Sequence, residues 1–371
     1  MFTYETFQQQ QMDLIARLRA EVQGLFAVSD IRSSARGDSV LFVGQLQSDA
    51  ESVYGALRER FRRLGYTPLL RREGGTDIVV AQRGLSPGAR FNPLINLGLL
   101  AATLATTIFA GAGFAGVNPL PGLRLALNTG NWSGLAAALA AGIPFAFTLL
   151  FILGVHEMGH YVAARIHGVQ VTLPYFIPVP FGLGTFGAFI QLKSPVENRK
   201  ALFDVGLAGP LAGFVVALPL MVAGLLQSEI VPRAAGGTLG ASLLIRGLVD
   251  VVIPHAANQA VALSPMAIAA WFGLLVTAFN LLPMGQLDGG HIAYAVLGKA
   301  ARPLAYATFG LMLVLGMTAW SGWYTWAFFA LLTGLAHAEP LNDITPLDGA
   351  RKFLGALTLA LFLLLITPRP F

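Results

Sequence analysis

The sequence predicts a polytopic α-helical membrane protein of about six or seven spans, preceded by a small N-terminal α+β soluble domain. Apolar residues make up 55% and charged residues only 12% of the 371 residues, and the mean hydropathy is +0.65. These values are typical of a chain that crosses a bilayer several times. Residues 1–90 hold 12 of the 24 Lys and Arg and 10 of the 19 Asp and Glu. We therefore expect a soluble head over residues 1–85, a linker over 86–93 and a membrane part over 94–371.

The head has the pattern of a small α+β domain. Apolar residues recur every three or four positions in two stretches and alternate in three others. It has no histidine and no clustered carboxylates, so we expect an accessory or regulatory role and not a catalytic one. Its arginines indicate a solvated face, or contact with anionic lipid headgroups. The expected elements are helix 7–25, strand 39–46, helix 50–64 and strands 67–71 and 78–82.

The membrane part contains seven apolar stretches that predict spans. The second is 33 residues long, whereas one simple crossing needs roughly 20, so we expect a single span with extra turns. Between the spans we expect a Pro/Gly/Asn loop over 117–132 and a surface helix over 240–252. The stretches are 94–116, 134–166, 203–226, 265–282, 303–320, 323–335 and 353–366.

Lys and Arg residues predict the orientation, because cytosolic loops carry the excess of positive charge. Most basic loop residues fall on the side of the head, so we expect the head to be cytosolic. The net charge of +5 is modest and does not indicate a nucleic-acid partner. The head side holds Arg165, Lys193, Arg199, Lys200, Lys299, Arg302, Arg351 and Lys352, and the opposite side Arg124, Arg233, Arg246 and Arg369.

An H-E-x-x-H pattern lies inside the second apolar stretch. His156 and His160 are four residues apart, so on a helix both imidazoles project from one face and can bind one Zn²⁺. Glu157 lies beside the first ligand, where it can act as a general base on water. A structural alternative is a buried polar cluster in which the histidines pair with Glu157. Ionisable groups are costly at membrane depth, so their presence there indicates function.

A second segment supplies the third ligand. With no cysteine in the chain, the metal must be held by His, Asp or Glu. The predicted topology brings Asp288 to the depth of His156, which completes a site of three protein ligands with one open position. Asn280 can donate to a peptide carbonyl, Pro283 shapes the same segment, and His291 can support Asp288 through a hydrogen bond. Structural roles at a helix end are an alternative for Asn280 and His291.

The segment 171–193 is too broken by Pro and Gly for a spanning helix and too apolar for an ordinary loop. Irregular backbone at membrane depth is tolerated where it lines a cavity or packs on protein. We expect a β-hairpin whose edge holds an extended substrate peptide, although a loop that only caps the bundle is the alternative. The residues expected to form it are Gly182, Gly184, Thr185, Phe186 and Gly187.

At these residues the sequence resembles the site-2 protease family of intramembrane zinc metalloproteases, over about residues 95–350. The resemblance rests on the H-E-x-x-H pattern, the small residues of 206–213, the hairpin at 182–190 and the run from Asn280 through Pro283 to Asp288-Gly289. It implies zinc held by two His and one Asp, with Glu157 as the general base. It also implies cleavage of a single-span membrane protein within the bilayer, for example to release a transcription regulator or an anti-sigma factor.

The head is similar to that of the cyanobacterial and chloroplast branch of this family. Richness in Ala, Arg and Gly, with no transit peptide expected, favours the cytoplasmic membrane of a bacterium, with the active site open to the cytosol. Two other functions are compatible with the sequence. One is a metal-ion transporter or channel that uses His156, Glu157, His160 and Asp288, and the other is a catalytically silent adaptor of the same fold. A metalloprotease with a Glu third ligand and a soluble zinc domain fits poorly.

Overall fold

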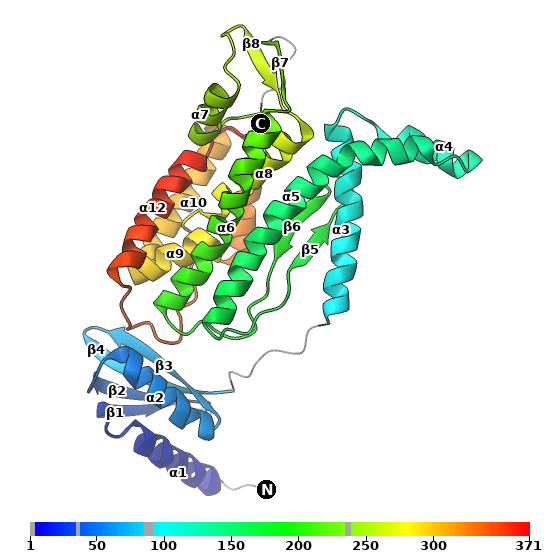
Figure 1. Cartoon of the computed structure of the whole chain (residues 1–371). Coiled ribbons are helices and arrows are strands. Elements are labelled where there is room, and N and C mark those ends of the chain that lie inside the picture. The colour runs from blue at the N-terminus through cyan, green and yellow to red at the C-terminus, as the bar shows by residue number, and fades with distance from the viewer. Residues whose placement is uncertain (1–3, 35–37, 85–91, 234–238) are drawn as a thin grey trace.

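The computed structural model describes residues 4–34, 38–84, 92–233 and 239–371. Figure 1 shows a small α+β head at one end of a helical bundle, with a two-stranded sheet and a short helix at the opposite end. Most of the predicted linker 86–93 lies outside the described residues. The predicted boundaries of the head, linker and membrane part stay predictions, but the head has a hydrophobic core of its own.

The head is a four-stranded antiparallel sheet with two helices. The strand order is β1-β2-β4-β3, and alternate residues of β2 and β4 face the core, as period-two patterning requires. Leu57, Phe61 and Leu70 are fully buried there. The elements are α1 (Tyr4–Val22), β1 (Phe26–Ser33), β2 (Ser39–Leu46), α2 (Ala50–Arg63), β3 (Tyr66–Glu73) and β4 (Thr76–Arg83).

The predicted helices and three strands of the head are confirmed, but the order α-β-α-β-β is wrong because β1 is missing from it. This strand carries Asp30 and Arg32 and is mostly exposed. It lies at the sheet edge, and its pairing with β2 shifts between Val28 and Asp30. Such an edge strand lacks the alternation that identified the other three.

Four helical segments among the described residues are long and apolar enough to cross a membrane. They are α3 (Pro93–Phe114), α5 (Ser133–Ile166), α6 (Arg199–Leu225) and the continuous run of α9 (Asp288–Leu297), η2 (Gly298–Ala300) and α10 (Ala301–Thr318). The chain is thus a helical membrane protein.

The predicted count of six or seven spans is not confirmed. Three further apolar helices have 16, 12 and 17 residues, which is short of the roughly 20 that one crossing needs. These helices are α8 (Pro265–Asn280), α11 (Gly322–Thr333) and α12 (Gly349–Leu365).

The expected loop over 117–132 is instead a helix, α4 (Pro119–Thr129), which projects sideways from the bundle in Figure 1. The residues that suggested a loop are its caps. Asn118 accepts a hydrogen bond from the Leu120 N–H, Pro119 is the first helical residue, and Gly130 ends the helix in the left-handed conformation. Pro at the start and Gly just past the end are favoured helix boundaries.

One β-hairpin and a second two-stranded antiparallel sheet complete the membrane part. The hairpin predicted within 171–193 is confirmed as β5 (Tyr175–Pro178) paired antiparallel with β6 (Thr185–Phe189). The predicted surface helix over 240–252 is α7 (Leu243–Val252). The second sheet, β7 (Glu229–Pro232) paired with β8 (Gln259–Ala262), is not predicted from the sequence, because each of its strands has only four residues.

Candidate metal centre

Helix α5 presents the H-E-x-x-H pattern to the inside of the bundle. His156, Glu157 and His160 are 4%, 7% and 7% exposed, although they lie within an apolar helix of 34 residues. One-turn spacing places both imidazoles on the same helix face, and their Nε2 atoms are 3.1 Å apart. The predicted arrangement of the two histidines is therefore present.

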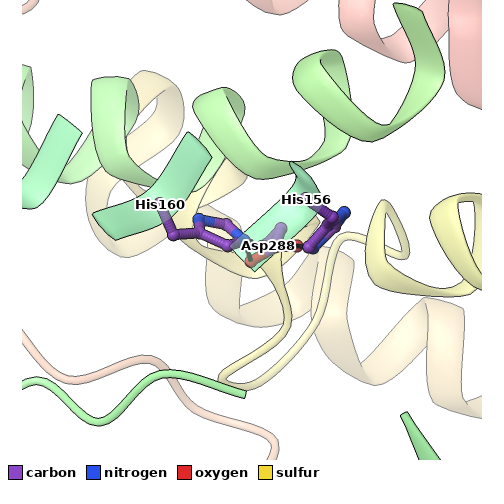
Figure 2. A group of neighbouring side chains, drawn as sticks. All are labelled: His156, His160 and Asp288. Carbon is purple, nitrogen blue, oxygen red and sulfur yellow. Dashed lines mark hydrogen bonds and ion pairs between the residues drawn. The ribbon is translucent and has the colours of Figure 1, made fainter. Parts of the chain in front are cut away.

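Asp288 meets these histidines from the start of α9 (Figure 2). Its Oδ2 lies 3.3 Å from Nε2 of His156, and its Oδ1 lies 3.3 Å from Nε2 of His160. One ligand atom from each residue lies within 4.8 Å of the other two, and within the described part of the chain this is the one such cluster of His, Asp or Glu. The predicted meeting of Asp288 with the two histidines is therefore present, whereas their depth in a membrane stays a prediction.

The donor set fits a zinc ion. Nδ1 of His160 lies 2.7 Å from the Val205 carbonyl oxygen, so it must carry the proton and leave Nε2 with a free lone pair. The two Nε2 atoms then lie 3.1 Å apart, and each lies 3.3 Å from a different oxygen of Asp288. Ligands held about 2.0–2.2 Å from a tetrahedral zinc are separated by roughly 3.3–3.6 Å. A cation between these atoms would convert a repulsive arrangement into a favourable one.

Two glycines of α6 make room for metal-binding side chains, and a third makes room for His291. A Cβ atom added at Gly209 would overlap the imidazole of His160, and one at Gly213 would lie 3.2 Å from Cβ of His156. A Cβ at Gly206 would lie 2.8 Å from Cβ of His291. The small residues of α6 were predicted to allow close packing on α5. They also leave the space that these side chains occupy, and larger residues would displace them.

Two of the three other candidates in the Asp288 segment do not contact the metal ligands. Nδ2 of Asn280 lies 3.3 Å from Nε2 of His156, whereas Pro283 lines a cavity of about 290 Å³ with His337 and Glu339. The expected hydrogen bond from His291 to Asp288 is absent among the described residues. His291 Nδ1 is instead hydrogen-bonded to Nε2 of His337.

His337 is not among the site residues predicted from the sequence. The ring of His337 also stacks on Tyr294 at 5.1 Å, and burial lowers its pKa, which favours the neutral imidazole. No pattern in the sequence links His337 to His291, since their contact depends on how the chain after α11 folds back onto α9.

The β5–β6 hairpin lies between α3 and α5 (Figure 1). Positive φ angles of 60°, 81° and 99° at Gly182, Gly184 and Gly187 explain the glycines, because other residues rarely adopt them. Thr185 stabilises the turn by donating to the Ile177 carbonyl at 2.9 Å, and Phe186 is 67% exposed. The hairpin also adjoins the site, since Glu157 interacts with the backbone of Ile190, directly after β6.

Comparison with known families decides the identity of this region, because residues 144–319 match the model of the family described as Peptidase family M50. Residues 144–319 belong to peptidase family M50. The matched residues contain His156, His160 and Asp288, the three that form the cluster. The family predicted from the sequence is confirmed.

Curated relatives of this chain include plant proteins. The "Probable zinc metalloprotease EGY1, chloroplastic" of Oryza sativa subsp. japonica is 30% identical over 90% of the chain, and that of Arabidopsis thaliana is also 30% identical over 90%. The "Probable zinc metalloprotease EGY2, chloroplastic" of Arabidopsis thaliana is 34% identical over 63% of the chain and 43% of its own length. The chain spans 63% and 66% of the lengths of the two EGY1 proteins.

These relatives support the predicted likeness to the chloroplast branch. Their names describe them as probable zinc metalloproteases, which agrees with the predicted zinc cofactor. They do not support the predicted bacterial cytoplasmic membrane, because their names place them in chloroplasts. The four candidate spans make this chain an integral membrane protein. Its host membrane and its orientation stay predictions.

Proposed function

We propose that this chain is an intramembrane zinc metalloprotease that hydrolyses a peptide bond in or near the transmembrane helix of a single-span membrane protein. One observation carries the proposal. Ligand atoms of His156, His160 and Asp288, from two remote segments, lie within 4.8 Å of one another inside apolar helices. The family match and the names of the relatives support the same reaction.

His156, His160 and Asp288 would hold the zinc. The bound ion would polarise the peptide carbonyl and make water a stronger nucleophile. Glu157 takes a proton from the attacking water, and the hydroxide oxygen forms a bond to the carbonyl carbon. As the carbon–nitrogen bond breaks, Glu157 returns the proton to the leaving amine. Asn280 is placed to donate its Nδ2–H to the carbonyl oxygen, because it lies next to His156.

The substrate must present an extended segment, because a helix hides its carbonyl oxygens in hydrogen bonds to the N–H groups four residues later. The β5–β6 hairpin is placed to bind such a segment. It is a two-stranded sheet, so each strand has an edge that can pair with a peptide. Its neighbour Ile190 lies beside Glu157, which would bring a bound strand to the proton acceptor.

The distribution of Lys and Arg supports a head and an active-site opening on the cytosolic side. We further propose that cleavage releases a membrane-tethered protein, such as a transcription regulator or an anti-sigma factor, from the cytoplasmic membrane of a bacterium. This part of the proposal follows from the resemblance to site-2 proteases.

Proteoliposomes test the activity directly. The purified chain is reconstituted with a panel of tagged single-span helices, before and after zinc removal by 1,10-phenanthroline. We expect fragments from at least one helix, no fragments from the zinc-free protein, and recovery when one equivalent of zinc is returned.

Fragments that persist after zinc removal would contradict the proposal. Zinc entry into the vesicle lumen without cleavage would support the transporter alternative. Stable substrate binding without cleavage in the zinc-loaded protein would support the adaptor alternative.

A further inference from the structure

The loop over 334–345, between α11 and α12, joins the head to the segment that carries Asp288. On the head side the loop lies alongside β3 and pairs with it at Leu70. The Leu70 N–H donates to the Leu341 carbonyl at 2.8 Å, and the Asp343 N–H donates to the Leu70 carbonyl at 3.1 Å. Arg71 forms an ion pair with Glu339 at 2.6 Å and also donates to the Pro340 carbonyl at 2.7 Å. The loop is thus bonded to the head through main chain and side chain.

Apolar packing and further ion pairs strengthen this attachment. Leu341 and Ile344 of the loop pack against the core of the head. The start of α6 and the residues before it contribute two ion pairs, Arg58 with Glu197, and Lys200 with Glu51 at 2.7 Å. Glu51 and Arg58 are more than half exposed, and exposed pairs are individually weak and sensitive to salt. Salt should therefore weaken the ion-pair part of this attachment.

At its other end, the same loop packs on the residues around Asp288. His337 is hydrogen-bonded to His291, which lies three residues after Asp288 and so on the same face of α9. The Gly285 N–H donates to the Leu335 carbonyl at 3.1 Å. Any movement of this loop would be transmitted to the start of α9, where the third metal ligand lies.

We propose that His337 is a positioning residue for Asp288, and that docking of the head holds His337 in place. The head then controls how firmly the metal is held. Hydrogen-bonded partners behind a metal ligand commonly change metal affinity by 10–100-fold. Among the described residues His291 forms no hydrogen bond with Asp288, so the effect of His337 would pass through the turn of α9 that joins His291 to Asp288. We therefore expect the lower part of that range, about tenfold. A change in the rate of zinc release tests this proposal whether or not the chain is a protease. A change in the rate of cleavage would rest on the proposed function as well.

Zinc release measured under excess chelator tests the proposal in the full-length protein. We expect His337→Ala and Arg71→Glu each to speed release about tenfold, and His337→Gln to restore most of the wild-type rate by replacing the hydrogen bond. If both residues act along one route, the double variant is no faster than the faster single variant. The control is Arg62→Glu, which removes an exposed ion pair within the head and should leave the rate unchanged.

A charge exchange separates undocking from misfolding. Arg58→Glu should speed zinc release, and adding Glu197→Arg should restore the wild-type rate, which a folding defect would not allow. The chain has no cysteine, so Glu51→Cys with Lys200→Cys, joined by a bis-maleimide, reports docking and should cross-link poorly in Arg71→Glu.

Wild-type zinc release in both single variants, or rates that multiply in the double variant, would overturn the proposal. Altered zinc release in a protein that cleaves no substrate would leave the proposal standing and would contradict the proposed function.

Discussion

Glu157→Gln is expected to lower the rate of cleavage of a membrane-span substrate by about 10²–10⁴-fold while the zinc content stays at the wild-type level. Gln has nearly the same shape as Glu but cannot accept the proton of the attacking water. The three residues proposed to hold the metal, His156, His160 and Asp288, are unchanged in this variant. The measurements are fragment yield in proteoliposomes and zinc per chain by elemental analysis.

Glu59→Gln is the matched control, because Glu59 is an exposed carboxylate on the head and its loss should change neither quantity. The Glu157→Gln variant should also retain uncleaved substrate, so membrane proteins that co-purify with it are candidates for the natural substrate. Turnover equal to that of the wild type would remove Glu157 from the mechanism.

Gly209→Ala is expected to weaken zinc binding about 10–100-fold, the range found when the partners around a metal ligand are disturbed. The added methyl group would overlap the ring of His160, whose Nδ1 is already hydrogen-bonded to Val205. The imidazole must then rotate or move away from Asp288 and His156. Zinc affinity by competition with a chelating dye measures the effect, and cleavage should fall in parallel.

Two other glycines calibrate this result. Gly310→Ala in α10 places its methyl group in open space and should leave zinc affinity unchanged. Gly213→Ala meets His156 at 3.2 Å, so a smaller loss than for Gly209→Ala is expected. If Gly209→Ala bound zinc as tightly as Gly310→Ala does, the packing of α6 would not set the position of His160.

The parts of the fold that could be predicted are those set by local spacing. His156 and His160 share a helix face because they are four residues apart, and strand β2 begins and ends where its alternation predicts. Asp288 could be predicted only indirectly, because its depth was inferred from the direction of each predicted span and from the charges of the loops. The structure brings Asp288 to 3.3 Å from both imidazoles.

The parts that could not be predicted depend on contacts between remote segments. His337 reaches His291 only because the chain folds back after α11. The pairing of Leu70 with the loop at 341–343 joins residues that no sequence pattern connects. The segment of helix α4 was predicted to be a loop for another reason. Its capping residues are of the same types that occur in loops.

The ligand set of the bound zinc tests the central claim most directly. X-ray absorption at the zinc edge, recorded on the zinc-loaded wild type and on Asp288→Ala, reports the atoms around the ion. We predict one zinc per chain with two imidazole nitrogens and a carboxylate oxygen in the wild type. In Asp288→Ala we predict either loss of the metal or a changed spectrum that keeps both imidazoles. A wild-type spectrum without two imidazoles, or one that Asp288→Ala leaves unchanged, would contradict the account.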